Sequence, residues 1–113
     1  MVDQARAELW VQGRPQNGSR IVLSKGVTWI GRATTNNIVV EDSGVSRQHA
    51  GIREDRAGYW IKDMGSTNGT YINGLRVRGE GQRLQDNDRI ELGSNGSVAW
   101  VFKLPAQGDS RSA

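Results

Sequence analysis

The amino-acid sequence predicts an all-β fold, a sandwich or barrel of short strands, on three observations. Short runs of β-branched and aromatic residues recur along the chain, and segments rich in Gly, Asn and Asp separate them. No segment shows sustained helical periodicity with capping residues. The length of 113 residues is typical of one domain with one core. Together these features favour a single small β domain.

The expected strands follow one another in chain order, and each ends at a turn-forming segment. They cover residues 7–11, 19–23, 27–30, 38–40, 49–53, 59–62, 70–72, 75–77, Leu84, 89–92 and 98–104. The dipeptide Asn73-Gly74 is the strongest short-range hairpin signal in the chain. Gly, Pro and Asn in residues 12–18 predict another hairpin loop.

The core should take one face of each strand. In the last run, the alternate residues Val98, Trp100, Phe102 and Leu104 share one parity, so we expect them to line the core. We also predict core positions for all four tryptophans, Trp10, Trp29, Trp60 and Trp100, because each falls in a strand-like run. Residues 1–6 and 105–113 are expected to be an N-terminal tail and a flexible C-terminal tail.

The composition predicts a cytoplasmic protein without a membrane segment. Cys is absent, which excludes disulfides and thiolate metal sites and fits a reducing compartment. The first eight residues carry charges where a secretory signal needs an apolar run, and no run approaches membrane-spanning length. The formal charge is +3, but Lys and Arg are spread along the chain, so we expect no nucleic-acid partner.

Three polar segments between expected strands hold the residues with functional chemistry. They are Gly31-Arg32, residues 46–49 (Ser-Arg-Gln-His) and residues 65–70 (Gly-Ser-Thr-Asn-Gly-Thr). Each connects two strands, so a sandwich can bring all three to one rim. Guanidinium groups, hydroxyls, an amide and glycine-exposed backbone N–H groups are the donors that a phosphate dianion needs. A phosphorylated side chain is therefore the expected ligand.

Each of these residues taken singly also has an ordinary structural explanation. Arg32 fits a surface arginine, Ser46 a hydroxyl that caps a turn, and His49 a satisfied structural histidine. Only their convergence in space distinguishes a binding site from three unrelated loops.

Catalysis by Ser46 and His49 is not expected. If the two residues were in an extended strand, their odd separation would send the side chains to opposite faces, and no Gly-x-Ser-x-Gly elbow surrounds the serine. With one His and no Cys, the sequence offers no metal cluster. We predict a protein that is not an enzyme and that uses no metal or cofactor.

The three segments together resemble the signature of the forkhead-associated (FHA) domain family, which is Gly-Arg, then Ser-x-x-His, then Asn-Gly. This chain has Gly31-Arg32, the run 46–49 and Asn68-Gly69 in that order. The likeness covers most of residues 7–104, which we assign as the FHA domain. It implies an eleven-stranded β-sandwich of SMAD/FHA type whose loops at one end bind phosphothreonine in partner proteins.

The resemblance also implies a role for each matched residue. Arg32 is the expected main phosphate ligand, and Ser46 donates its hydroxyl to another phosphate oxygen. Arg47 and Thr67 are expected to approach the phosphate, and Asn68 to hold the peptide backbone. The residues expected to support these from behind or within the turns are His49, Gly31, Gly65 and Gly69.

The resemblance leaves selectivity and partner open. Some relatives have an arginine two positions before the motif serine that recognises an acidic residue, but this chain has Gly44 there. The loop 93–97 is a candidate for flanking contacts, whereas Arg76 and Arg78 should lie about 10 Å away, one short strand beyond the site. We expect a phosphothreonine-containing substrate of a Ser/Thr kinase as partner. The alternative is a scaffold domain that binds unphosphorylated protein.

Overall fold

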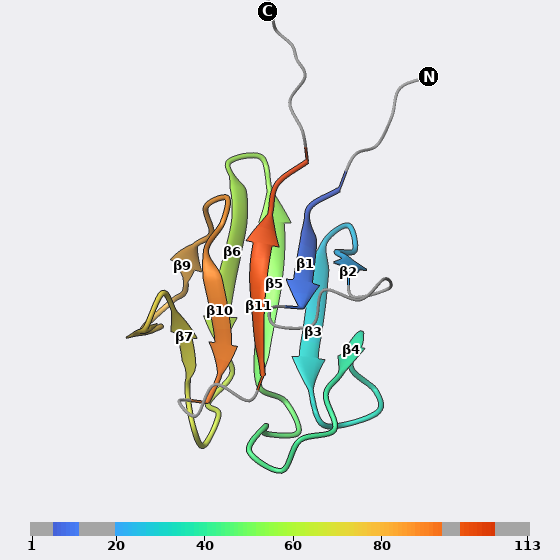
Figure 1. Ribbon diagram of the computed structural model, residues 1–113, viewed down its shortest axis with the longest axis vertical. Helices are drawn as coiled ribbons and strands as arrows, with labels where there is room; N and C mark the ends of the chain where they lie inside the picture. The colour runs from blue at the N-terminus through green and yellow to red at the C-terminus, as the bar shows by residue number, and fades with distance from the viewer. Residues whose placement is uncertain (1–5, 12–19, 94–97, 106–113) are drawn as a thin grey trace, which may run out of the picture.

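The computed structural model of the chain describes residues 6–11, 20–93 and 98–105, which form eleven strands in two sheets (Figure 1). The six-stranded sheet has the order β2-β1-β11-β10-β7-β8 and the five-stranded sheet the order β4-β3-β5-β6-β9. The strand bounds are β1 Glu8–Val11, β2 Arg20–Val22, β3 Val27–Gly31, β4 Ile38–Val39, β5 Ala50–Asp55, β6 Gly58–Asp63, β7 Thr70–Ile72, β8 Leu75–Arg76, β9 Gln82–Arg83, β10 Arg89–Leu92 and β11 Ala99–Lys103. The all-β sandwich that the sequence predicts is confirmed.

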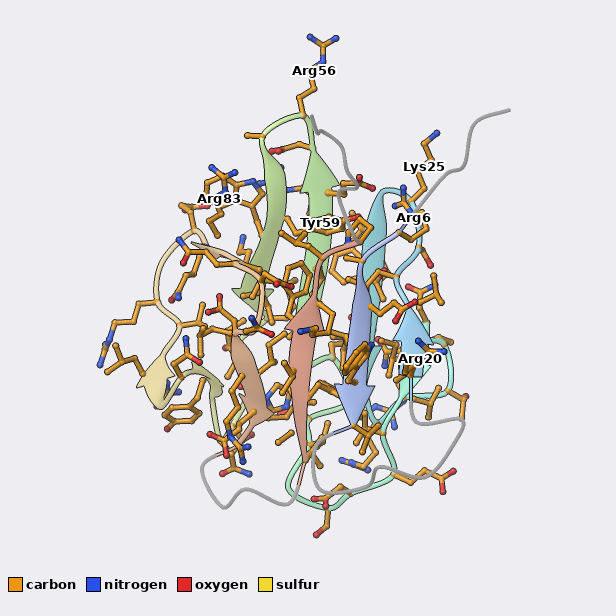
Figure 2. The ribbon with its side chains drawn as sticks, turned by 45° about the horizontal axis from the view of Figure 1, so that its top comes forward. Arg6, Arg20, Lys25, Arg56, Tyr59 and Arg83 are labelled. Atoms are coloured by element: carbon orange, nitrogen blue, oxygen red, sulfur yellow. The ribbon has the colours of Figure 1, made fainter. Side chains whose placement is uncertain are left out.

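The core lies between the two sheets and consists of the inward residues of both. Leu9 of β1, Ile30 of β3 and Ile61 of β6 are fully buried there. Tyr59 of β6 is labelled in Figure 2. Its ring meets that of Phe102 of β11 edge to face, with 5.4 Å between the ring centroids. An aromatic pair in this geometry adds stabilisation beyond its buried area and ties one sheet to the other.

The prediction that every tryptophan packs in the core is wrong for Trp10 and Trp29. Their side chains are 40% and 41% exposed, because each stands at an outward position next to a buried neighbour in its strand. Trp60 is half-buried on the same outer face as Trp29, and Trp100 lies in the core as expected. Basic side chains lie 5.0 to 6.0 Å from the ring centroids of Trp10 and Trp60 and partly cover them.

The last strand agrees with its predicted parity only in part. Trp100 and Phe102 are buried, and Val98 is half-buried against the core. Leu104 is 39% exposed, so its core assignment is wrong. The strand ends at Lys103, and the backbone N–H of the next residue donates instead to the Asp86 carboxylate.

The turn at Asn73-Gly74 confirms the predicted hairpin between β7 and β8. Both residues have positive φ, 52° and 86°, as a type I′ turn requires. The strand expected at Leu84 lies slightly earlier, at Gln82–Arg83, and Leu84 itself is buried in the core. The expected hairpin loop 12–18, residues 94–97, and residues 1–5 and 106–113 of the tails are outside the described residues.

The strand connections divide between the two ends of the sandwich (Figure 1). The β3–β4, β4–β5 and β6–β7 connections, which carry the three polar segments, lie at the lower end of that view. The β5–β6 hairpin lies at the opposite end. In the described ranges no helix is long and apolar enough to cross a membrane.

Candidate functional site

Hydrogen bonds join the three polar segments into one rim. The backbone N–H of Arg32 donates to the Ser46 carbonyl at 2.9 Å, which links the β3–β4 and β4–β5 connections. The Ser46 Oγ accepts the Thr67 backbone N–H at 3.0 Å, and the Asn68 side-chain amide donates to the Gly44 carbonyl at 2.8 Å. The structure therefore brings Arg32, Ser46, Thr67 and Asn68 together, as the sequence-based hypothesis requires.

The Arg32 side chain is anchored and still has donors to spare. Its Nε donates to the Val45 carbonyl at 2.9 Å, which fixes the plane of the guanidinium. The side chain is exposed, and no described residue accepts a bond from its terminal Nη groups. An arginine held in this way can direct two N–H groups at an anion with little loss of side-chain freedom.

No described residue accepts the hydroxyl proton of Ser46. A hydroxyl has one proton to donate and two lone pairs, and the Thr67 N–H occupies one lone pair. Ser46 is half-buried, so its Oγ is held in place while its proton can still turn toward a ligand. Thr67 and Asn68 are exposed beside it.

Gly31 is required by a close backbone approach. A Cβ at this position would lie 2.2 Å from the Arg47 carbonyl oxygen, far inside any real contact distance. The same carbonyl accepts bonds from the Asn36 side-chain amide at 2.7 Å and from the Ala33 N–H at 3.2 Å. The Arg47 backbone is therefore fixed at the rim, and its side chain is exposed next to Ser46.

His49 braces two of the connections from beneath, as the resemblance implies. The imidazole is fully buried; its Nδ1 accepts the Ser46 backbone N–H at 3.0 Å, and its Nε2 pairs with the Gly69 carbonyl at 2.8 Å. Because Nδ1 accepts and a carbonyl cannot donate, the ring is neutral with its proton on Nε2. The His49 side chain thus fixes the position of Ser46 relative to the 64–69 loop.

The hydrogen bonds of His49 also leave no ring nitrogen available to activate Ser46. Ser46 and His49 lie in a loop before β5, so the extended geometry used to separate them is wrong. Both ring nitrogens are nevertheless occupied by backbone groups, and neither is placed to take a proton from the Ser46 hydroxyl. Within the described ranges, no group of three or more His, Asp and Glu residues could hold a metal ion.

Asp63 shapes the 64–69 loop and was missed in the sequence analysis. Its carboxylate accepts the backbone N–H groups of Gly65 and Ser66, both at 3.0 Å, and the hydroxyls of Ser66 and Thr70 at 2.6 and 2.7 Å. Partial burial acts to raise the pKa of Asp63, but these hydrogen bonds outweigh it and hold the pKa below the ordinary value of 3.8. Gly65 and Gly69, both at positive φ, complete the turn.

Comparison with known proteins places this geometry in a family. The family model of the FHA domain matches residues 28–93, more than half of the chain, and this range contains all nine predicted site residues. The chain belongs to the FHA domain family. A solved FHA domain, from a study of phosphothreonine-dependent FHA interactions, covers 90% of this chain and 99% of its own, with a TM-score of 0.77 and 29% identity.

Two curated relatives are longer than the segments that match this chain. Protein FraH of Nostoc sp. is 49% identical over 61 residues, which are 53% of this chain and 21% of FraH. The oxoglutarate dehydrogenase inhibitor of Corynebacterium efficiens is 38% identical over 87 residues, which are 77% of this chain and 60% of the inhibitor. The chain thus spans about a fifth of one relative and three fifths of the other.

Proposed function

We propose that this FHA domain binds phosphothreonine in partner proteins and so makes a protein–protein contact depend on a Ser/Thr kinase. The observation that carries the proposal is that backbone and side-chain bonds hold Arg32 against the Val45-Ser46 backbone. No described residue accepts a bond from the Arg32 Nη groups or from the Ser46 hydroxyl. The guanidinium and the hydroxyl can each donate a charge-assisted hydrogen bond to a phosphate oxygen, and a phosphate dianion offers three such oxygens. The site lies in the cytoplasm in this proposal, because the kinase and its substrate must meet the domain there.

Each rim residue has one role in this proposal. Arg32 and Ser46 bind separate phosphate oxygens, and Arg47 and Thr67 add donors at the edge of the phosphate. Asn68, whose amide donates to the Gly44 carbonyl, still has its own carbonyl and a second N–H to hold the peptide backbone. His49 and the glycines Gly31, Gly65 and Gly69 keep these groups in register without touching the ligand.

The alternative function is a scaffold that binds unphosphorylated protein through the same face. The anchored guanidinium of Arg32 favours the phosphate-dependent function, because its charge-assisted hydrogen bonds to a phosphate are stronger than bonds to the neutral carbonyls of an unphosphorylated peptide. Nucleic acid is a third ligand with phosphate groups, and we propose that it does not bind, since such binding needs many cations in a stripe.

A binding screen of a randomised phosphothreonine peptide library, followed by calorimetry on single peptides, tests the proposal. We expect micromolar affinity, about −8 kcal/mol. Arg32→Ala should lose about 1.5 to 3 kcal/mol of it, the range for hydrogen bonds to charged groups. Arg56→Ala, at the far hairpin, is the matched control and should bind as wild type does (Figure 2).

Three comparisons interpret the result. Equal binding of the unphosphorylated peptide supports the scaffold function, and unchanged binding by Arg32→Ala rejects the phosphate site. A phosphoserine copy of the best peptide should bind more weakly, and equal dissociation constants would remove the preference for threonine. Steep salt dependence together with binding to single-stranded DNA would instead support nucleic acid.

A further inference from the structure

Arg76, which has no role in the proposed phosphate contacts, lies against the rim of the site. It belongs to β8 and is opposite Tyr71 in the pairing with β7. A Cβ placed on Gly69 would be 3.0 Å from the Arg76 Nε and 3.1 Å from its Cζ, so the guanidinium covers Gly69 directly. Gly69 follows Asn68, the residue proposed to hold the peptide backbone. The separation between Arg76 and the site that strand length predicts is therefore too long. The β7–β8 hairpin brings the Arg76 side chain back onto the 64–69 loop.

The charge of Arg76 is not neutralised by the rest of the described chain. The side chain is exposed, and no described residue makes a hydrogen bond or an ion pair with it. Two other arginines, by contrast, are engaged locally: Arg53 pairs with Asp55 at 2.7 Å and Arg89 with Glu91 at 3.2 Å. An unpaired guanidinium at a binding rim can pair with a ligand without first breaking an internal bond.

The guanidinium of Arg76 shares the surface over Gly69 with the ring of Tyr71. The Cε1 atom of Tyr71 lies 3.1 Å from the same Cβ position on Gly69, so the phenol ring and the guanidinium cover this glycine side by side. The carbonyl of Gly69 is in turn held by His49 and by the Gly93 N–H at 2.8 Å. The cation therefore lies over a part of the loop that backbone and imidazole hydrogen bonds hold in place.

Asn68 also contacts the connection between β4 and β5. There the Asn68 amide donates to the carbonyl of Gly44, the position at which some relatives carry an arginine. Two carboxylates, Glu41 and Asp42, lie in that connection, and the Asp42 Oδ1 accepts the Gly44 N–H at 2.8 Å. A peptide that crosses Asn68 thus passes close to both the Gly44 segment and the Arg76 cation.

We propose that Arg76 is a specificity-determining residue, which pairs with an Asp or Glu side chain of the partner on the Gly69 side of the phosphothreonine. Because the guanidinium lies just beyond Asn68, the acidic residue is about two or three positions from the phosphothreonine at roughly 3.3 Å per residue. This inference rests on the proposed function and deepens it. It assigns acidic selectivity to β8 in place of the position of Gly44.

The test is a binding matrix of peptides and variants. The peptides are the best phosphothreonine peptide with each flanking position in turn set to Ala, Glu or Lys. The proteins are wild type, Arg76→Glu, Arg76→Gln and, as a control with the same charge change at the far end of the sandwich, Arg56→Glu. Figure 2 shows Arg56 pointing away from the tip of the β5–β6 hairpin.

At one flanking position we expect Glu to improve binding to wild type about fivefold over Ala, the upper range for an exposed charge pair. The preference for a peptide with Glu should disappear in Arg76→Gln and persist in Arg56→Glu. In Arg76→Glu the peptide with Lys should bind best. A reversal of preference cannot arise from lost folding, and thermal unfolding of each variant provides a separate check on folding.

Two results overturn the inference. One is a wild type with no acidic preference at any position, and the other is an acidic preference that Arg76→Glu retains. If either occurs while Arg32→Ala still loses phosphopeptide binding, the proposed function stands and only the role of Arg76 is rejected. If wild type binds no phosphothreonine peptide, both are rejected.

Discussion

The two ends of the sandwich use the same kinds of residue, yet only one of them forms a candidate site. At the site end Asp63 accepts the N–H groups two and three residues ahead, and at the β5–β6 hairpin Asp55 does the same with Ala57 and Gly58. Both ends also carry arginines and glycines at positive φ. Local turn chemistry is therefore common to the two.

The β5–β6 turn and the rim differ in the sequence separation of their side-chain bonds, although Glu54 beside the turn also pairs with the distant Arg6. At the hairpin, the side-chain bonds of Asp55 to described residues join positions two to five residues apart. At the rim, the bonds made by Arg32, Ser46 and Asn68 join residues 13, 21 and 24 positions apart. Long-range bonds hold side chains from three connections in one geometry, and this preorganisation separates a binding rim from a turn.

The largest expected effect comes from Gly31→Ala. Its Cβ would overlap the Arg47 carbonyl oxygen, so we expect a loss of about 3 kcal/mol in unfolding free energy together with loss of phosphopeptide binding. Gly58→Ala at the other end is the control: its Cβ would meet only the end of the Arg83 side chain at 3.2 Å, although φ is +138°. That variant should lose about 1 kcal/mol and bind normally. Urea denaturation and calorimetry measure both, and equal binding by the two variants would contradict the account.

The next effect concerns Asp63→Asn. The amide replaces an oxygen that accepts N–H or O–H donors, so we expect a loss of about 1.5 kcal/mol at about pH 7, limited by partial solvent screening. Because the pKa of Asp63 is lower in the folded state, its contribution is complete above the ordinary pKa of 3.8 and disappears as the pH falls through the folded pKa. The stability difference from wild type should shrink at about pH 3. A difference that stays constant over this range would show that the carboxylate charge is not what holds the loop.

The smallest effect is expected for Asp55→Asn. Desolvation acts to raise the pKa of Asp55, but bonds from the Ala57 N–H and the Arg53 side chain lower it more. The Asp55 side chain is exposed, so the change in stability and in its pH profile should be smaller than for Asp63→Asn. Phosphopeptide binding should not change. Weaker binding by this variant would mean that the hairpin end takes part in recognition.

The sequence was sufficient for features with local causes. Alternation of apolar residues predicts the strands, and Asn73-Gly74 predicts its own turn, since the dipeptide provides the positive φ values. It was not sufficient for the outward tryptophans, because strand propensity does not say which parity faces the core. Trp10 and Trp29 therefore looked like core residues until their buried neighbours were known.

The site shows the same division. The phosphate-site candidates came from a motif, and the structure brings four of them together through bonds that no short window reveals. Asn36 and Asp63 were missed because their importance lies in the partners they bind, the Arg47 carbonyl and the Thr70 hydroxyl, and not in their own type. Arg76 was underestimated because distance along a strand ignores the fold of its hairpin.

Amide chemical-shift mapping with a phosphothreonine peptide tests the central claim most directly. If the long-range rim is the binding site, the largest shifts should fall on the amides of Arg32, Thr67 and Gly69, and those of Ala57 and Gly58 should stay unchanged. The unphosphorylated peptide should cause no shift at the rim. Shifts concentrated at the β5–β6 hairpin, or equal shifts with both peptides, would contradict the account.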